Sequence, residues 1–490
     1  MSKYCDFQQV HYPRGLVIVL PIFSLPSPYG IGSFGSEAFR FIDYLKDLGA
    51  KYWQVLPLGP TSYGNSPYSS NSSYAGNPYF IDLDQLCDEG LLDPTDLEEQ
   101  KNSCSVVDYA FLFAKRTRIL EKAYKNWKRE ESFQIFVENN PWLKSYCLFM
   151  TLKRTFAYKS WMDWPEDYKN CNSKALRKFC EEHQDQIDFE AFVQYKFYQQ
   201  WERIRTYAKK QGIYIIGDLP IYVAMDSVDI WEHPELFLQD ALSGAPPDFY
   251  NKKGQLWGTP IYDWGKIEED QYSYFIRKID QQRKLYDILR LDHFIGYIHY
   301  WKVPKDSQDA SLGRWAKGPG LKLFKALEDK LGPLSLLLED LGALSEEVIE
   351  ARESLHFPGM NLIQYAFENE NSPYLPHNAE KRSSIYGSTH DSPTLMAWWK
   401  NLEDEDRRKV VLYFGLNREE GIWKGLLRGL LSSVSDFCVL QMQDLMSLEE
   451  EGRINVPGKF EGNWLWKMPN TYEDMDVKET ISKMVKRYGR

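Results

Sequence analysis

The sequence predicts an α/β protein built on a (β/α)8 TIM barrel with inserted subdomains, and two observations lead to this prediction. Eight short β-branched or leucine-rich runs recur along the 490 residues, with helical periodicity between most of them, which implies a parallel sheet. Acidic side chains stand at or just beyond the ends of four different runs: Asp218, Asp292, Glu339 and Asp391. A barrel builds its active site at such strand ends. A doubly wound sheet also fits eight strands, but it would draw its site from the few strands at its switch point.

The predicted strands are short, and two of the connecting helices carry recognisable ends. The first helix has Ser36 as its N-cap, an apolar face and Gly49 at its end. After the seventh strand, Ser392 and Pro393 are expected as the N-cap and first position of a helix. The eight strands are expected at Leu16–Leu20, Tyr52–Leu58, Ile213–Gly217, Ile288–Asp292, Leu334–Glu339, Met360–Gln364, Ile385–Asp391 and Phe437–Asp444.

Two connections are too long for barrel loops and predict insertions. Residues 60–186 follow the second strand and contain amphipathic stretches, so we expect a mainly helical insertion there. Residues 222–268 are rich in Pro, Gly, Asp and aromatic residues, and we expect them to form a loop insertion over the barrel mouth, between strands 3 and 4. The catalytic barrel then consists of residues 1–59 and 187–490.

Charge and cysteine usage limit what the protein binds and where it works. The formal net charge is −11 without a long basic cluster, which argues against nucleic-acid binding. The longest apolar run, Leu16–Phe23, is too short to span a bilayer, and residues 1–9 lack the pattern of a signal peptide. Seven cysteines without a C-x-x-C pair are typical of reduced thiols. We therefore expect a cytoplasmic protein with a neutral ligand, and the sequence indicates no oligomeric state.

Aromatic side chains make up 15% of the chain, and many of them stand beside Gly, Pro, Ser or Asn, as Tyr63, Tyr68 and Trp257 do. An aromatic ring in a polar loop offers a flat apolar face with a hydrogen-bonding edge, which matches a sugar ring. The same residues would also fix long loops to the core. The sequence leaves both interpretations open.

Other ligand classes fit the sequence poorly. Residues Gly30–Gly35 match G-x-G-x-x-G, but five residues with two prolines separate them from the strand, and the second strand ends without an acid for a ribose. Strand-end acids would also suit Mg²⁺, but Arg290 would repel a cation and no strand-end Lys is obvious as a base. The eight histidines contain no H-x-x-x-H pair for zinc. We expect no cofactor and no metal.

Three strand ends carry groups for acid/base chemistry. Arg290 and Asp292 lie on one face of their strand, so the guanidinium is expected to lower the pKa of Asp292 and keep this candidate nucleophile ionised. A structural ion pair gives the same pattern. Glu339 ends a very apolar strand, where burial raises a carboxyl pKa and leaves a proton donor. Two such carboxyls, about 5 to 5.5 Å apart, suit retaining cleavage of a glycosidic bond.

His390 and Asp391 end the seventh run and offer an imidazole for a sugar hydroxyl and a carboxylate for an oxocarbenium-like transition state. Asp391 would equally well cap the helix that follows. Asp218, in Gly217–Pro220, has a similar ambiguity between a turn residue and a ligand.

These residues belong to long, ordered motifs that run along nearly the whole chain. By these motifs the chain resembles the amylomaltases, or 4-α-glucanotransferases (disproportionating enzymes), of glycoside hydrolase family 77, whose barrel is similar to that of the α-amylases. The motifs are Ser27–Gly32, Trp53–Pro60, Ser66–Tyr68, Ala75–Tyr79, Gly217–Pro220, Pro246–Asp248, Gly254–Gly258, Arg290–His293, Glu339–Gly342 and His390–Asp391.

The resemblance implies that Asp292 is the nucleophile, Glu339 the general acid/base and Asp391 the stabiliser of the transition state, with no metal or organic cofactor. It also implies a set of substrate-binding residues around the cleaved bond and the barrel mouth: Tyr68, Asn77, Asp218, Asp248, Trp257, Arg290 and His390. The chain departs from the family pattern at Lys459, which follows Asn455–Gly458 where Thr is usual, and at Ala245 where Val is usual. Both departures lie outside the implied catalytic set.

The activity that the resemblance implies is a retaining 4-α-glucanotransferase. It would move α-1,4-glucan segments to the 4-hydroxyl of glucose or of another maltooligosaccharide through a covalent glucosyl-enzyme. Two alternatives stay open. An α-glucan hydrolase of the α-amylase type uses the same acid/base cycle, and a noncatalytic glucan-binding protein would use the same aromatic surfaces. The expected partners are maltooligosaccharides, α-1,4-glucans and glucose, and neither nucleic acid nor a membrane.

Overall fold

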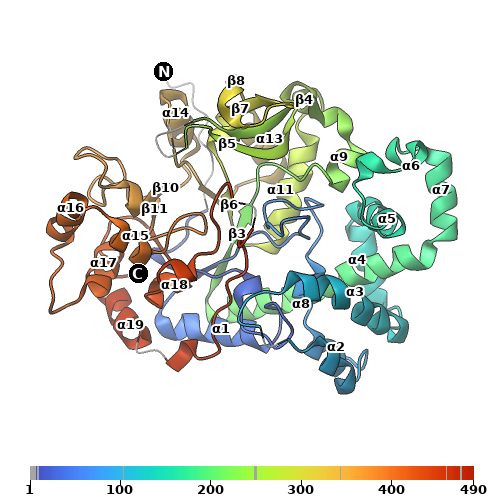
Figure 1. The fold of residues 1–490 in the computed structure, drawn as a ribbon, viewed down its shortest axis with the longest axis horizontal. Coiled ribbons are helices and arrows are strands. Elements are labelled where there is room, and N and C mark those ends of the chain that lie inside the picture. The colour runs from blue at the N-terminus through green and yellow to red at the C-terminus, as the bar shows by residue number, and fades with distance from the viewer. Residues whose placement is uncertain are drawn as a thin grey trace.

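The computed structural model describes residue 7 and residues 10–102, 104–247, 251–342, 344–459, 461–474 and 477–490. Within these residues, eight parallel strands form one sheet in the order β10-β11-β12-β1-β2-β3-β6-β9 (Figure 1). The amide of Leu338 donates to the carbonyl of Pro358 over 2.9 Å and joins the two ends of the sheet, which closes it into the predicted (β/α)8 barrel. The strands are β1 Gly15–Val19, β2 Tyr52–Gln54, β3 Tyr214–Leu219, β6 Ile288–Leu291, β9 Leu336–Leu338, β10 Gly359–Leu362, β11 Ser383–Tyr386 and β12 Phe437–Gln441.

Strands β2, β9, β11 and β12 are shorter than predicted, and the early ends of β2 and β11 have identifiable reasons. β2 ends at Gln54, and Pro57, which has no N–H for a ladder, follows soon after. β11 ends at Tyr386, and once the amide of Gly387 has donated to Val439 the chain leaves the sheet. The segment with His390 and Asp391 is therefore a loop rather than the end of a strand.

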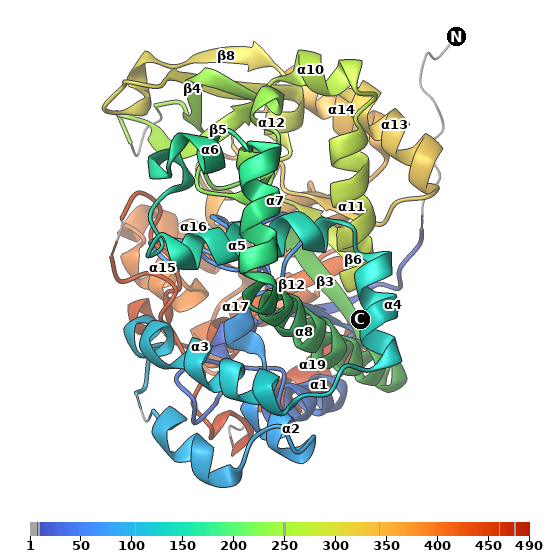
Figure 2. The same ribbon diagram turned by 90° about the vertical axis from the view of Figure 1, so that its right-hand side faces the viewer.

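Helices surround the barrel (Figures 1 and 2). Gly35, and not Ser36, is the N-cap of α1, whereas Gly49 ends this helix as predicted, in the left-handed region with φ 84°. No helix in the described part of the chain is long and apolar enough to cross a membrane. The helices that follow barrel strands are α1 Ser36–Leu48, α8 Gln184–Gln211, α11 Ser273–Leu285, α12 Ile295–Ile298, α13 Leu321–Leu331, α14 Glu346–Leu355, α15 Leu395–Asn401, α16 Asp404–Phe414, α17 Ile422–Leu431, α18 Met442–Leu445 and α19 Val477–Arg487.

The helix after β11 starts later than predicted. Thr394 is its N-cap, since its Oγ1 accepts a hydrogen bond from the amide of Ala397. The Oγ of Ser392 instead accepts a hydrogen bond from the amide of Thr389 over 2.9 Å. The expected cap at Ser392 and Pro393 is wrong because Ser392 closes the loop that precedes the helix.

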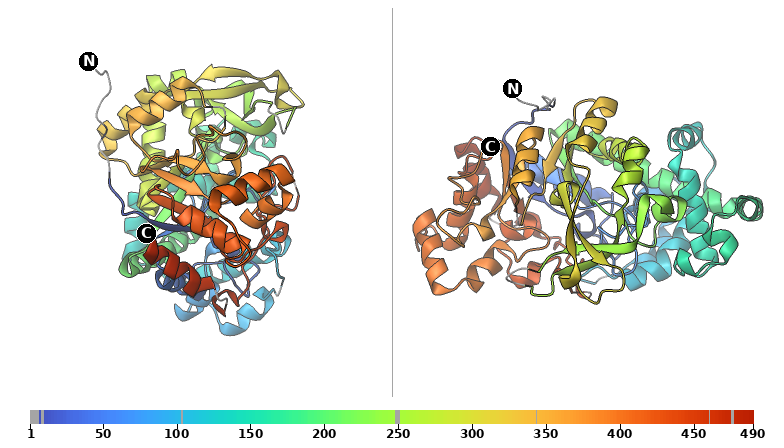
Figure 3. Two further views of the ribbon diagram at one scale, coloured as in Figure 1. Left: turned by 90° about the vertical axis from the view of Figure 1, so that its left-hand side faces the viewer. Right: turned by 90° about the horizontal axis from the view of Figure 1, so that it is seen from above.

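A mainly helical layer lies beside the barrel between β2 and α8, on the side opposite to α15–α17 (Figure 3, right). Helix α5 packs on α8, and both contribute to a separate apolar cluster that includes Phe149, Leu152 and Tyr195. Helix α8 starts at Gln184, close to the expected boundary at residue 187. The helices of this layer are α2 Leu83–Asp88, α3 Tyr109–Asn126, α4 Glu131–Asn139, α5 Trp142–Thr155, α6 Glu166–Lys169 and α7 Ser173–Glu182.

A second sheet of four antiparallel strands, in the order β5-β4-β7-β8, lies apart from the barrel sheet. Residues 222–268, which were expected as a loop insertion, contribute two of its strands. The other two come from the chain after β6 and were not predicted from the sequence. The elements are α9 Val228–Glu232, β4 Phe237–Ala245, β5 Gln255–Tyr262, α10 Trp264–Glu269, β7 His299–Pro304 and β8 Arg314–Lys317.

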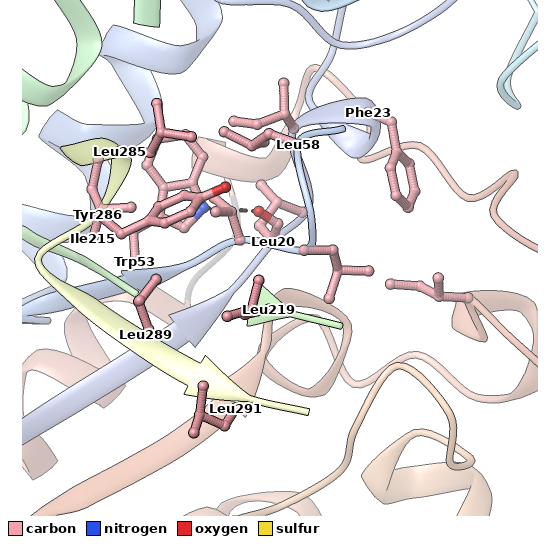
Figure 4. Close-up of a cluster of buried hydrophobic side chains, with 14 of the residues drawn as sticks. Leu20, Phe23, Trp53, Leu58, Ile215, Leu219, Leu285, Tyr286, Leu289 and Leu291 are labelled. Carbon is pink, nitrogen blue, oxygen red and sulfur yellow. Dashed lines mark hydrogen bonds between the residues drawn. The ribbon is translucent and has the colours of Figure 1, made fainter. Parts of the chain in front are cut away.

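Side chains along β6 point alternately to the outside and to the inside of the barrel. Leu289 and Leu291 belong to the large apolar cluster that also contains Trp53 (Figure 4). Ile288 belongs to a different cluster, which fills the barrel interior. The two-residue period of a strand therefore places Arg290 on the inner face, above this apolar layer.

Candidate active site

Charged side chains gather at the carboxyl ends of β3 and β6. Nη1 of Arg290 lies 2.7 Å from both carboxylate oxygens of Asp218 and 3.2 Å from Oδ1 of Asp292. The strand register pairs Asp218 with Arg290 directly, and the strand period brings Asp292 to the same face. Arg290 and Asp218 are buried, whereas 25% of the Asp292 side chain is exposed. The guanidinium therefore binds Asp218 more closely than Asp292.

The pKa of Asp292 departs from the expected direction. Burial raises it to about 6, and the charge of Arg290 only partly opposes this rise. The expected lowering was wrong because burial outweighs the charge of Arg290, and because Asp218, which shares the guanidinium, adds a second negative charge beside Asp292. Asp292 nevertheless favours its ionised form at neutral pH.

Glu339 follows β9 and contacts the backbone just after Asp292. The amide of His293 donates to Oε2 of Glu339 over 2.7 Å, and His293 adopts the left-handed backbone conformation with φ 50°. Burial raises the pKa of Glu339 to about 8, against the charge of Arg290 and together with that of Asp292. At neutral pH Glu339 therefore favours its protonated form, the direction expected from its apolar strand.

The loop after β11 brings His390 and Asp391 to the same group of side chains. The ring of His390 stacks on Tyr68 with centroids 5.0 Å apart, and the hydroxyl of Tyr68 donates to Asp218 over 3.0 Å. Nε2 of His390 lies 3.4 Å from Oδ2 of Asp391. Burial disfavours the anion, but His390 and Asn455 outweigh it and lower the pKa of Asp391 to about 2. Asp391 is thus ionised and half-exposed, which suits a group that meets positive charge on a substrate.

Two of the expected binding residues make their described contacts outside this group of side chains, and one is not described. The ring of Trp257, on β5, stands edge-on to His293 at 4.8 Å and is partly exposed. Asn77 is buried, and its Oδ1 accepts a hydrogen bond from the amide of Tyr79 at the start of the 3-10 helix η2 Pro78–Phe80. Asn77 thus has a local structural contact. Asp248 lies outside the described residues.

Asn455 is a site residue that the sequence did not reveal. Its Nδ2 donates to Oδ1 of Asp391 over 2.6 Å, and its amide donates to the carbonyl of His390 over 3.0 Å. The motif Asn455–Gly458 belongs to the family resemblance, which implies no catalytic role for it. A residue so far beyond the last strand gives no sign, in one sequence, of which loop it meets.

Lys278 is a second residue that the sequence did not reveal. It lines a small cavity of about 40 Å³ together with Tyr68 and Asp218. Its buried Nζ donates to the carbonyls of Pro220 over 3.0 Å and Ile221 over 3.2 Å, and burial lowers its pKa to about 8. Lys278 thus supports the backbone that follows Asp218. A single Lys on an amphipathic helix carries no signal of this contact.

The glycine-rich segment Gly30–Gly35 serves close packing. A Cβ on Gly32 would lie 1.9 Å from the carbonyl oxygen of Ile22, and one on Gly35 would lie 2.0 Å from the carboxylate of Asp82. Close packing therefore accounts for these glycines, and no bound nucleotide is needed to explain them. Among the described side chains, no three His, Cys, Asp or Glu residues are grouped so that they could hold a metal ion.

Known proteins resemble this chain along nearly its whole length. The model of a family described as 4-alpha-glucanotransferase matches residues 20–472. A 4-alpha-glucanotransferase of Clostridium butyricum is 43% identical over 483 residues, which cover 96% of this chain and 99% of that protein. One of Aquifex aeolicus is 42% identical with the same coverage. The solved structure of an amylomaltase from Streptococcus agalactiae in complex with acarbose superposes with a TM-score of 0.95 at 36% identity, and the match covers 97% of this chain and 99% of that one.

Proposed function

Because this chain belongs to the 4-alpha-glucanotransferase family, we propose that Asp292, Glu339 and Asp391 carry out its reaction by a retaining double displacement. The chain is a 4-alpha-glucanotransferase, and this class of enzyme acts on α-1,4-glucans and maltooligosaccharides. Its relatives and its solved neighbour favour neither the hydrolase nor the noncatalytic binding protein that the sequence left open.

In the first step, a carboxylate oxygen of Asp292 attacks the anomeric carbon of the donor glucan. The bond from this carbon to the glycosidic oxygen breaks as the covalent glucosyl-enzyme forms. Glu339 gives its proton to that oxygen, so the leaving chain departs as a neutral alcohol. Glu339 is left as a carboxylate.

In the second step, the 4-hydroxyl of glucose or of another maltooligosaccharide attacks the same carbon. Glu339 takes the proton from this hydroxyl as the new glycosidic bond forms. The bond to Asp292 breaks and its carboxylate is restored. Two inversions at one carbon leave the α configuration unchanged.

Asp391 acts in both steps, because each passes through a transition state with positive charge on the sugar. Its low pKa keeps the carboxylate ionised, and its exposed half is free to meet that charge. Arg290, Asp218, Tyr68 and His390 form the surrounding polar and aromatic wall. Trp257 and Asp248 are proposed to contact the glucan at the barrel mouth, and Asn77 to support this region.

The observation that carries the proposal is the difference between two neighbouring carboxyls. Asp292 favours the ionised form at neutral pH and Glu339 favours the protonated form, although the charge of Arg290 lowers the pKa of both. A nucleophile and a proton donor need these opposite states. His293 follows Asp292 in the chain, and its backbone amide donates a hydrogen bond to Glu339. This bond supports a fixed arrangement of the two carboxyls.

Why a sugar rather than water completes the reaction does not follow from these carboxyls, since both outcomes use the same cycle. Aromatic surfaces that bind a sugar and exclude water favour transfer. Trp257 beside His293, and Tyr68 stacked on His390, are proposed to serve as such surfaces, and their ring contacts support this role.

Incubation with maltotriose, followed by chromatography of the products, tests the proposal. The wild-type chain should give free glucose together with a ladder of longer oligomers. Asp292→Asn and Glu339→Gln should each lower the rate by at least about a thousandfold while the variants stay folded. Glu98→Gln, at an exposed side chain, is the matched control and should keep full activity. Full activity of Asp292→Asn would refute the assigned nucleophile.

We also place the reaction in the cytoplasm. The described cysteines Cys87, Cys104, Cys147, Cys171, Cys180 and Cys438 are free thiols, as a reducing compartment would keep them. Location of the tagged full-length chain after cell fractionation tests this proposal.

A further inference from the structure

The loop that carries His390 and Asp391 is fastened at both ends to one buried carboxylate. Oδ2 of Asp444 accepts a hydrogen bond from the hydroxyl of Ser388 over 2.5 Å, and Oδ1 accepts one from the amide of Leu395 over 2.7 Å. Ser388 precedes the two site residues and Leu395 begins helix α15. Asp444 is fully buried, in helix α18 directly after β12.

Gln441, the last residue of β12, makes a second connection to this loop. Its Nε2 donates to Oγ of Ser388 over 2.6 Å and to the carbonyl of Thr389 over 3.0 Å. The amide of Gln441 donates to Asp444 over 3.3 Å. The backbone hydrogen bonds between β11 and β12 end at Gly387. Beyond this point the side chain of Gln441 holds the two segments together.

The burial of Asp444 has a cost that its hydrogen bonds must offset. Burial raises the pKa of Asp444 to about 6, whereas the bonds from Ser388, Leu395 and Gln441 oppose this rise. A buried carboxylate is unfavourable unless polar partners satisfy it. In this position it accepts one donor from each end of the loop, which restricts the movement of the loop.

We propose that Asp444 is a positioning residue for the transfer reaction, which acts with Gln441 and Ser388 to hold Asp391 where positive charge develops on the sugar. The inference rests on the role proposed above for Asp391. It assigns a function to side chains on β12 and α18 that touch neither the substrate nor the reacting atoms.

The loop geometry explains why such a support is needed. Asp391 itself is held by the hydrogen bond from Asn455, and its neighbour His390 by the stack on Tyr68. Without Asp444 the two ends of the loop would lose their common anchor. A shift of about 1 Å in a catalytic group can cost about a hundredfold in rate.

Steady-state kinetics of Asp444→Asn, measured by glucose release from maltotriose, test the inference. Because Asp391 acts on the transition state, kcat should fall about 10- to 100-fold while KM changes less than about threefold. Asp82→Asn is the matched control, since Asp82 is also buried and accepts bonds from a serine hydroxyl and a helix amide, those of Ser33 and Gln85. It should lower the melting temperature comparably and leave kcat unchanged.

The decisive measurement repeats Asp444→Asn in an Asp391→Asn background. If Asp444 works through Asp391, the second substitution should lower kcat by less than about threefold there. If Asp444→Asn lowered kcat by the same factor in both backgrounds, or changed KM alone, the inference would be overturned. The proposed role of Asp391 would be unaffected by this result. If Asp391→Asn by itself left kcat unchanged, the proposed role of Asp391 would fail, and the inference with it.

Ser388→Ala is the second variant, for the case that Asp444→Asn does not fold. It removes one hydroxyl between Asp444 and Gln441 and leaves both of these residues in place. We expect kcat to fall about 3- to 10-fold, again only while Asp391 is present. An unchanged kcat in a folded Ser388→Ala variant would contradict the inference.

Discussion

Asn455 donates a hydrogen bond from Nδ2 to Oδ1 of Asp391 over 2.6 Å, which ties the C-terminal part of the chain to the loop after β11. The amide of the same residue binds the carbonyl of His390. Asn455 therefore orients the carboxylate that we assign to transition-state stabilisation and contributes to its low pKa. A neutral donor can do this without adding a charge that would compete with the substrate.

Asn455→Ala should lower kcat for maltotriose about tenfold, with KM nearly unchanged, because Asp391 loses the partner that orients it. Asn463→Ala is the control. Asn463 binds the backbone of Val456 and Lys459 in the same segment but does not touch Asp391. If kcat fell by the same factor in both variants, Asn455 would act through the fold of this segment and not through its bond to Asp391.

The pH dependence of kcat/KM should be bell-shaped. Activity requires Asp292 ionised and Glu339 protonated, so it should rise through a pKa of about 6 and fall through a pKa of about 8. The two carboxyls interact, and the limbs therefore report the pair. In Glu339→Gln, whose amide cannot titrate, the alkaline limb should disappear from the residual activity. An alkaline limb that persists in this variant would contradict the assignment of Glu339.

Glu339 should also make thermal stability depend on pH. Its pKa lies above the ordinary value of 4.5 in the folded chain, so its contribution to stability is fully present below pH 4.5 and is lost as the pH rises through about 8. Gln resembles the protonated acid and does not titrate. The melting temperature of Glu339→Gln, relative to wild type, should therefore increase from acidic to alkaline pH. Calorimetry at both ends of this range measures the difference, and a constant difference would contradict the raised pKa.

The sequence predicted the barrel and the chemistry on its strand ends because both depend on local order. Arg290 and Asp292 share a face wherever their strand lies, and an acid after an apolar strand such as Glu339 is buried in any barrel of this kind. The prediction for the pKa of Asp292 was wrong because this pKa depends first on burial in the folded site, and then on Asp218, a residue of another strand that competes for Arg290. Which neighbour shares a charge is a property of the folded chain.

The contacts missed from the sequence are those between segments far apart in the chain. Asn455 meets Asp391, Lys278 meets the backbone after Asp218, and nothing in the local pattern marks either pair. The cap of α15 was misplaced for a related reason: Thr394 and Ser392 both suit a cap, and Ser392 is occupied within the preceding loop. Local preference cannot choose between two good candidates when a tertiary contact takes one of them.

Asp218→Asn tests how the charge of Arg290 is divided. Because the negative charge of Asp218 raises the pKa of Asp292, its removal should move the acidic limb of kcat/KM to lower pH. The maximum rate should fall at the same time, since Tyr68 and Arg290 lose a partner. An acidic limb at unchanged or higher pH would show that Asp218 does not influence Asp292 in solution.

Gly217→Ala should destabilise the barrel, although the change adds a single methyl group. A Cβ at Gly217, on β3, would lie 2.2 Å from the ring of Tyr286, which is itself buried at the end of α11. Relief of this overlap requires a shift of the ring or of the strand, and overpacking of this kind costs about 1 to 3 kcal/mol or more. Gly265→Ala, in helix α10, is the control, because the nearest neighbour of its Cβ is a side-chain oxygen of Asp263 at 3.3 Å and Ala favours a helix. Thermal melts should show a clearly lower melting temperature for Gly217→Ala and little change for Gly265→Ala. Equal melting temperatures of the two variants would contradict the predicted overlap between a Cβ at Gly217 and the ring of Tyr286.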